Sequence, residues 1–299
     1  MKKETIDKIT LYHIRQRDKC YKKNGGTMKN IKLHNFCHGV LLPFIKLLRI
    51  LRKEKLIIVG DKRTNKIKPA IYACTHIGGF DVENLFEAIK SPCYLFIADP
   101  KEVYANLDGL MLWLNGAIFF ESYDKTDRNI AKIKACELMK SGGSLMIFPE
   151  GAWNIYESLP VMPLFWGTAD IAIQSGADII PVAIERFENK YYVNIGERID
   201  CGSVGETDKE VITQILRDEL AALKYEIWDS RGMYLRSELK DTRESFLNKM
   251  FGEKDTSFTV EDVIRTRFYP KDEVNETEVW KFMNDIEQRK ENAFMWRRL

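Results

Sequence analysis

Short apolar runs alternate with stretches of helical periodicity between residues 55 and 205. The runs are four to six residues long and predict buried strands at residues 56–59, 70–74, 93–98, 117–120, 145–148, 179–184 and 191–195. Helical patterns lie between several of them, at residues 81–89, 128–141 and 165–175. Alternation of this kind predicts an α/β domain, with a mostly parallel central sheet and helices on both faces.

After Gly205 the pattern becomes helical. A long amphipathic helix is expected at residues 208–228 with Thr207 as its N-cap, and shorter helical patterns cover residues 259–267 and 276–298. We therefore expect three parts: a basic N-terminal segment at residues 1–54, an α/β domain at 55–205 and a C-terminal helical extension at 206–299. The extension carries no motif that suggests a chemistry.

A basic amphipathic helix is predicted at residues 40–53. Its apolar residues share one face at helical spacing: Leu41, Phe44, Ile45, Leu48 and Leu51. Its basic residues lie on the other: Lys46, Arg49 and Lys53. Pro43 lies near the expected start, where a helix tolerates proline. Such a helix can lie in a membrane interface, but the pattern equally allows a helix that packs on its own domain.

The charge is unevenly distributed along the chain. The 299 residues are 45% hydrophobic and 30% charged, as in an ordinary globular protein with a sizeable core. Residues 1–55 hold 15 Lys and Arg against 4 Asp and Glu, whereas the remainder holds 31 against 40. A basic leader indicates an anionic partner. Because its basic residues accompany an apolar helix face, we expect an anionic membrane surface or an acidic carrier protein, and no nucleic acid.

The sequence also predicts a location. No apolar run approaches the ~18 residues that span a bilayer, and the N-terminus lacks the apolar region of a secretory signal. The six cysteines are scattered without a C-x-x-C pair, which fits reduced thiols and argues against a zinc site. We expect a cytoplasmic protein that is peripheral at the inner face of the membrane and binds no metal.

Candidate chemistry begins with an H-x-x-x-x-D pattern. A predicted strand ends at Thr75, His76 follows at once, and Gly78-Gly79 leads into a helix that begins at Asp81. Histidine is a natural general base near neutral pH. The glycine turn allows the carboxylate to reach the imidazole, fix its tautomer and stabilise the imidazolium. Alternatively, His76 is an ordinary strand-end residue and Asp81 only caps a helix.

A second candidate follows the strand at residues 145–148. Pro149, Glu150 and Gly151 come directly after that strand, and the bulky Trp153 lies beside them. In parallel sheets, ligands bind beyond the carboxyl ends of the strands. Glu150 is therefore expected where an α/β protein carries its chemistry.

The order of these segments resembles the phospholipid/glycerol acyltransferase family, which acylates glycerol-3-phosphate and lysophosphatidic acid. Residues 75–81 correspond to its Asn-His-x-Ser-x-x-Asp block, and residues 116–122 to its Gly-x-Ile-Phe-Ile-Asp-Arg block. Residues 148–154 correspond to Phe-Pro-Glu-Gly-Thr-Arg-Ser, and residues 180–184 to a Val-Pro-Val-Ala-Ile strand. Four blocks in family order, within residues 55–200, indicate a divergent relative of the 1-acylglycerol-3-phosphate acyltransferases.

The resemblance implies a glycerolipid-acyltransferase fold and a role in phospholipid biosynthesis. A fatty acyl group would pass from acyl-CoA or acyl carrier protein to the hydroxyl of a lipid or other acceptor, without an acyl-enzyme, a metal or another cofactor. His76 would deprotonate that hydroxyl and Asp81 would orient His76, while backbone N–H groups stabilise the oxyanion. The implied acceptor-binding residues are Glu150, Gly151, Glu121, Ser122 and Trp153.

Three cationic positions of the family are lost here. Ser122 and Trp153 stand where the family has phosphate-binding Arg residues, and at the third position Phe165-Trp166-Gly167 replaces the family's Lys-Lys-Gly segment. We favour an acceptor without a phosphate at this place, with Trp153 and Trp166 against a sugar or acyl chain, because three losses in one cluster are hard to treat as independent.

Two alternatives stay open. In the first, the tryptophans are core residues and other cations bind the phosphate: Lys101, Lys125 and Arg128 are candidates. In the second, the chain is a catalytically inactive module that binds lipid or acyl carrier protein.

Overall fold

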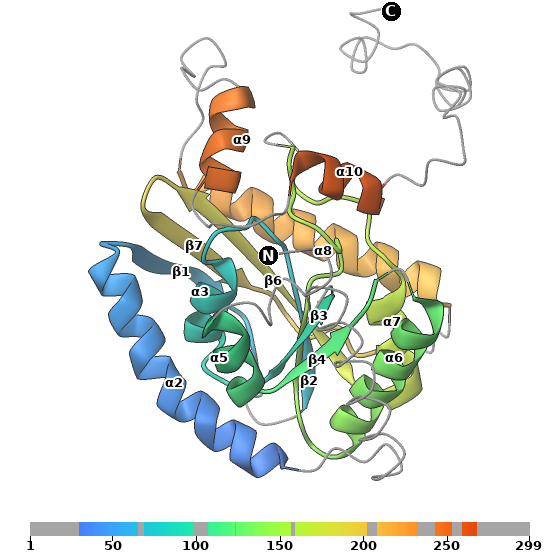
Figure 1. Ribbon diagram of the computed structural model, residues 1–299. Coiled ribbons are helices and arrows are strands. Elements are labelled where there is room, and N and C mark those ends of the chain that lie inside the picture. The colour runs from blue at the N-terminus through green and yellow to red at the C-terminus, as the bar shows by residue number, and fades with distance from the viewer. Residues whose placement is uncertain are drawn as a thin grey trace, which may run out of the picture.

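The computed structural model describes residues 30–64, 69–98, 107–122, 124–156, 159–201, 208–231, 243–252 and 259–267. Most of the basic N-terminal segment and the helix expected at residues 276–298 lie outside these ranges. The described residues form a central sheet with helices on both faces (Figure 1).

The sheet has seven strands in the order β1-β7-β6-β2-β5-β3-β4. Their bounds are β1 Lys55–Asp61, β2 Ala70–Cys74, β3 Tyr94–Ala98, β4 Ala117–Phe120, β5 Leu145–Ile147, β6 Asp178–Phe187 and β7 Lys190–Ile195. Neighbouring strands are parallel except for β6 and β7, which form an antiparallel hairpin. The predicted mostly parallel α/β sheet is confirmed, and each predicted strand is present within three residues of its expected ends.

Helices cover the sheet in two layers (Figure 1). On one face lie α2 (Ile31–Leu51), α3 (Asp81–Ile89) and α5 (Leu107–Asn115). On the other lie α6 (Lys125–Lys140), α7 (Gly167–Ser175) and α8 (Lys209–Asp229). Two short helices follow in the chain, α9 (Arg243–Gly252) and α10 (Val260–Arg267).

The central strand β2 shows why both faces need cover. All five of its residues are buried. Successive side chains of a strand point to opposite faces, so Ile71 and Ala73 join one core cluster while Ala70, Tyr72 and Cys74 join the other. A strand without a polar position can be stable only between two layers of helices.

The helix α8 belongs to the same core although the sequence placed it in an extension. Ile212, Leu216 and Leu220 lie in the cluster that α6 and α7 form with the sheet. The buried Lys224 donates to the carbonyl oxygen of Ile184 at 2.5 Å and lies 3.2 Å from the carboxylate of Glu185. This helix therefore ties the end of β6 to the layer behind it.

Several helix boundaries differ from the prediction. The helix α6 begins at Lys125 because the carboxylate of Asp124 accepts from the amides of Thr126 and Asp127, at 2.8 and 3.2 Å. The cap of α8 is Asp208, which accepts from the amide of Glu210; Thr207, the expected cap, lies outside the described residues. The short helices α5 and α9 were not predicted.

The N-terminal helix α2 departs most from its prediction. It begins at Ile31, so Pro43 lies inside the helix and the expectation that it marks the start is wrong. The expected faces are also wrong in part, because Arg49 is directed inward, where its guanidinium binds both carboxylate oxygens of Glu87 at 2.7 and 2.8 Å. Leu42 and Ile45 pack against the core.

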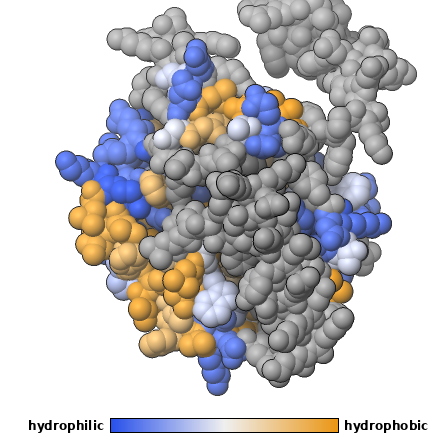
Figure 2. All heavy atoms as spheres, in the orientation of Figure 1, coloured by the Kyte–Doolittle hydropathy of each residue, from blue (hydrophilic) through white to orange (hydrophobic). Residues whose placement is uncertain are grey.

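A second apolar face of α2 is directed outward. Its exposed side chains recur at helical spacing: Leu33, Phe36, Val40, Phe44, Leu47, Ile50 and Leu51. Leu110 and Trp113 of α5, which packs beside α2, are exposed as well. We call these nine residues the α2–α5 apolar face; Figure 2 shows apolar side chains gathered over α2 at the lower left. The helix thus packs on its own domain and also presents an apolar surface to solvent.

Candidate active site

The structure brings His76 and Asp81 together at the carboxyl end of β2. Gly78 and Gly79 have φ values of +80° and +62°, in the left-handed region that favours glycine, and they turn the chain into α3. Across this turn, Nδ1 of His76 lies 2.7 Å from Oδ2 of Asp81. Because the carboxylate accepts the proton on Nδ1, the lone pair of the neutral ring lies on Nε2.

Asp81 is held on every side by hydrogen-bond donors. Its Oδ2 accepts from the amides of Ile77 and Gly78 at 2.9 and 3.0 Å, and its Oδ1 accepts from the amide of Val82 at 2.7 Å. Burial opposes its ionisation, but the His76 ring and the amides of Ile77 and Gly78 outweigh it, so the pKa of Asp81 lies below its ordinary value. The residue therefore both fixes the turn and keeps a carboxylate beside the imidazole.

Glu150 is directed into the protein rather than toward a substrate. Its side chain is 0% exposed. One carboxylate oxygen accepts from the amide of His76 at 3.1 Å, and the other accepts from the amide of Met162 at 2.9 Å. Burial raises its pKa, although the Met162 amide, Lys224 and the His76 amide partly offset this. Any contribution of Glu150 to acceptor binding would therefore be indirect.

The segment from Phe148 to Trp166, here called the β5–α7 loop, fixes the backbone of His76 at both of its polar groups. Glu150 accepts from the His76 N–H, and the amide of Asn154 donates to the His76 carbonyl oxygen at 2.8 Å. The sequence blocks at residues 75–81 and 148–154 are therefore joined through the backbone of His76.

Aromatic rings surround the imidazole. The Phe148 ring is stacked on the His76 ring with 4.0 Å between centroids, and the Trp153 ring is nearly perpendicular to the His76 ring at 6.1 Å between centroids. The His76 side chain keeps 18% exposure. A Cβ added at Gly78 would lie 3.0 Å from the Trp153 indole. Glycine at position 78, where the family has serine, therefore makes room for tryptophan at position 153, where the family has arginine.

A similar pairing occurs at Gly151. This residue has φ of +70°, and an added Cβ would lie 2.5 Å from the ring of Phe165. The adjacent Trp166 is half exposed, with the ammonium of Lys209 from α8 at 4.7 Å from its ring centroid. Aromatic rings thus occupy two of the places where the family pattern has cations.

Glu121 and Ser122 lie apart from this group. They follow β4, three strands along the sheet from β2, which corresponds to about 14 Å at the usual strand spacing. The Glu121 amide donates to Asp127 at 2.7 Å, and the guanidinium of Arg128 donates to the Ser122 carbonyl oxygen. Lys125 is exposed at the start of α6, and Lys101 lies outside the described residues. The second block therefore follows a strand that is three places along the sheet from the strand that leads to His76.

Two residues of the site were missed from the sequence. Phe148 was taken as the last residue of a strand, although its place in the third block could have suggested contact with His76. Phe251 of α9 lies 5.2 Å from Trp153 between ring centroids. No motif surrounds Phe251, so the sequence offered no signal for it.

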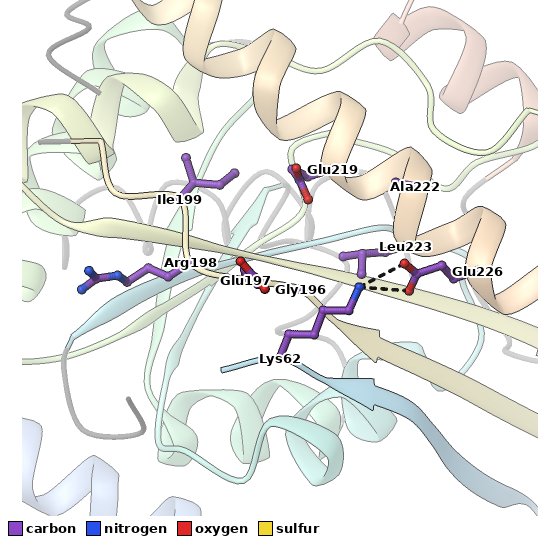
Figure 3. Close-up of a pocket in the computed structure, with 9 residues that line it drawn as sticks. All are labelled: Lys62, Gly196, Glu197, Arg198, Ile199, Glu219, Ala222, Leu223 and Glu226. Carbon is purple, nitrogen blue, oxygen red and sulfur yellow. Dashed lines mark hydrogen bonds and ion pairs between the residues drawn. The ribbon is translucent and has the colours of Figure 1, made fainter. Parts of the chain in front are cut away.

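A surface pocket of about 310 Å³ lies elsewhere, between the end of β7 and α8 (Figure 3). It is lined by charges of both signs, among them Lys62 and Glu226, which form an ion pair at 3.0 Å. None of the site residues predicted from the sequence lines it. The pocket is therefore separate from the chemistry at His76.

In the described ranges, no helix has the length and hydropathy needed to cross a membrane. Nor do these ranges contain three His, Cys, Asp or Glu side chains grouped so that they could hold a metal ion.

Known proteins are similar to this chain in sequence and in fold. Residues 55–185 match the family model described as Acyltransferase. The chain is 25% identical to the 1-acyl-sn-glycerol-3-phosphate acyltransferase of Borreliella burgdorferi over 178 residues, 56% of this chain and 70% of that protein. The crystal structure of the 1-acyl-sn-glycerophosphate (LPA) acyltransferase PlsC from Thermotoga maritima has the same fold. Its TM-score is 0.54 at 16% identity, and the match covers 79% of this chain and 100% of that chain.

Proposed function

The chain belongs to the acyltransferase family through residues 55–185, and we propose that it moves a fatty acyl group from a thioester to a glycerolipid-type hydroxyl. The donor is acyl-CoA or acyl carrier protein. The observation that supports this most directly is the 2.7 Å hydrogen bond between His76 and Asp81 at the end of β2. It leaves Nε2 as the basic nitrogen of a ring that keeps some exposure.

In the proposed reaction, Nε2 of His76 takes the proton of the acceptor hydroxyl as its oxygen attacks the thioester carbonyl. The Asp81 carboxylate stabilises the imidazolium that results. The new C–O bond forms, the C–S bond breaks, and the departing thiolate takes the proton from His76. Glu150 and Asn154 act as positioning residues, because they hold the backbone of His76.

The acceptor in this proposal carries no phosphate next to the reacting hydroxyl. Trp153 stands where the family has a phosphate-binding arginine, and its indole lies against Gly78 beside the base. Acyl transfer to monoacylglycerol and other neutral alcohols is compared with transfer to glycerol-3-phosphate and lysophosphatidic acid. Efficient, selective use of either phosphorylated acceptor would contradict this part of the proposal.

We also propose that the α2–α5 apolar face docks on an anionic membrane surface, at the inner face of the membrane. Nine exposed apolar side chains lie on two adjacent helices, and Lys32, Lys46 and Lys53 are exposed on α2 or directly after it. An apolar face flanked by lysines suits the boundary between acyl chains and anionic headgroups. Docking there would bring the enzyme to its lipid substrates.

The test of the chemistry is the variant His76→Ala. Acyl transfer is expected to fall by at least about a hundredfold, because the general base is lost. Thermal unfolding should change little, since the contacts of Glu150 and Asn154 use the backbone of His76. The matched control is His34→Gln, in which a second half-buried histidine is replaced while a donor to the Leu114 carbonyl is kept. Full activity of His76→Ala would refute the mechanism.

A second candidate is a non-catalytic module that binds lipid or acyl carrier protein. The loss of three cationic positions favours it. Wild-type protein that binds an acyl donor, yet turns over no thioester with phosphorylated or neutral acceptors, would support this candidate against the enzyme.

A further inference from the structure

The C-terminal helices α9 and α10 pack directly on the β5–α7 loop. Ala152, Ile155 and Met162 of that loop form a buried cluster with Val263 of α10, which is 1% exposed. Further apolar side chains of both helices pack against this cluster: Leu247, Met250, Phe251 and Val260. In Figure 1 the two helices, orange and red, lie at the upper end of the molecule.

The loop they cover is the one that fixes His76. Met162 belongs to the cluster with Val263, and its amide donates to Glu150, whose other oxygen binds the His76 amide. Two hydrogen bonds through a fully buried carboxylate therefore connect the packing of α10 to the base.

A second connection runs through Phe251 of α9. Trp153 lies between three groups: the turn at Gly78, the His76 ring at 6.1 Å and the Phe251 ring at 5.2 Å, both distances between ring centroids. Gly78 and Phe251 thus confine the indole beside the base. The indole is therefore held in one position and lines one side of the site.

We propose that α9 and α10 are part of the acceptor site, with Phe251 acting through Trp153 to select acceptors that are apolar or neutral beside the reacting hydroxyl. This inference rests on the proposed acyl transfer. A phosphate placed against the Trp153 indole would lose its hydration without gaining a guanidinium partner, and this desolvation is unfavourable. An acyl chain or the face of a sugar instead packs favourably on fixed aromatic rings.

The experiment compares Phe251→Ala and Phe251→Leu with the wild type, using monoacylglycerol and lysophosphatidic acid with one acyl donor. Loss of the ring contact in Phe251→Ala should raise KM for monoacylglycerol about two- to tenfold, with kcat within about threefold, as expected for the loss of one aromatic pair. The preference for the neutral acceptor should shrink, and Phe251→Leu should lie between the two. Asn248→Ala, on an exposed position of α9, is the matched control and should behave as wild type.

The outcomes separate the two proposals. Wild-type protein without acyl transfer to either acceptor would contradict the proposed function itself. Active wild type, with folded Phe251 variants that keep its KM and acceptor preference, would overturn the role of α9. If Phe251→Ala unfolds, Phe251→Leu decides, because it keeps an apolar side chain in the cluster while removing the ring.

Discussion

One carboxylate, that of Asp81, both closes the turn after β2 and orients the base. It accepts from three backbone amides and from the His76 ring. Replacing Asp81 would therefore disturb the turn as well as the chemistry. His76 is the better residue for separating catalysis from folding, because Asp81 keeps its three backbone-amide donors when the His76 ring is removed.

Gly78 and Trp153 should be energetically coupled. Gly78→Ser is expected to destabilise the protein by about 1–3 kcal/mol, because φ is +80° and the new Cβ would press on the indole. In the background of Trp153→Ala, the backbone strain remains but the clash is gone. Urea unfolding of the wild type, both single variants and the double variant should give a coupling energy of about 1 kcal/mol. Additive effects would show that the two residues do not press on each other.

The sequence allowed part of this residue-level geometry to be predicted. A strand-end histidine, a glycine pair and an aspartate predicted the His76–Asp81 contact. The inward direction of Glu150 could not be predicted, because its partners are backbone amides at His76 and Met162. Which way a carboxylate points depends on the path of the loop around it, and residue spacing does not encode that path.

At the scale of the element, α2 shows how a local signal can mislead. Pro43 was read as a start signal, yet the helix extends twelve residues before it. Periodicity could not assign the faces, because apolar residues occur on both the packed side and the exposed side. Arg49 lies inward because Glu87 of α3 neutralises it there, a tertiary contact invisible to helical spacing.

Membrane docking through α2 is tested at two outward positions. Phe36 and Leu47 are 69% and 51% exposed, so replacing both by Asp should leave the core intact. The affinity for anionic liposomes, measured by sedimentation, should fall at least about tenfold, since the apolar area buried in the bilayer decreases and negative charge is added.

The control replaces Val211 and Tyr225 of α8 by Asp; the two residues are 41% and 62% exposed on the helix layer that covers the other face of the sheet. It adds the same two charges away from the α2–α5 apolar face, and its sedimentation should fall much less. Equal loss in both variants would indicate nonspecific repulsion by the added charge. Wild-type sedimentation of the variant at Phe36 and Leu47 would refute docking through this face.

At the scale of the whole molecule, the fold class and the strands were predictable because each strand is an apolar run with polar or turn residues at its ends. The division into a domain and an extension describes the packing less well. Leu216 and Leu220 of α8 complete the core beneath β6, and α9 and α10 cover the loop that holds Glu150. These are contacts between segments distant in sequence, which periodicity alone cannot pair.

Stability should depend on pH through Asp81. Because its pKa is lower in the folded state, its carboxylate stabilises the protein above its ordinary pKa of 3.8, and this contribution is lost as the pH falls through the lower folded-state value. Asp81→Asn should therefore lower the free energy of unfolding most near pH 7, and the difference in this free energy between the variant and the wild type should shrink below about pH 4.

Urea unfolding of both proteins at several pH values measures this difference. Glu150, whose pKa shifts upward, is present in both proteins, so its effect cancels. A difference that stays constant from pH 7 into the acid range would mean that the charge of Asp81 does not contribute.

The packing of α9 and α10 has a practical consequence for anyone shortening the gene. A truncation after α8 would keep every motif described above, yet it would strip the cover from Ile155 and Met162 and leave them facing water. Such a fragment should accumulate in inclusion bodies, whereas a stop codon after Arg267 would retain both covering helices.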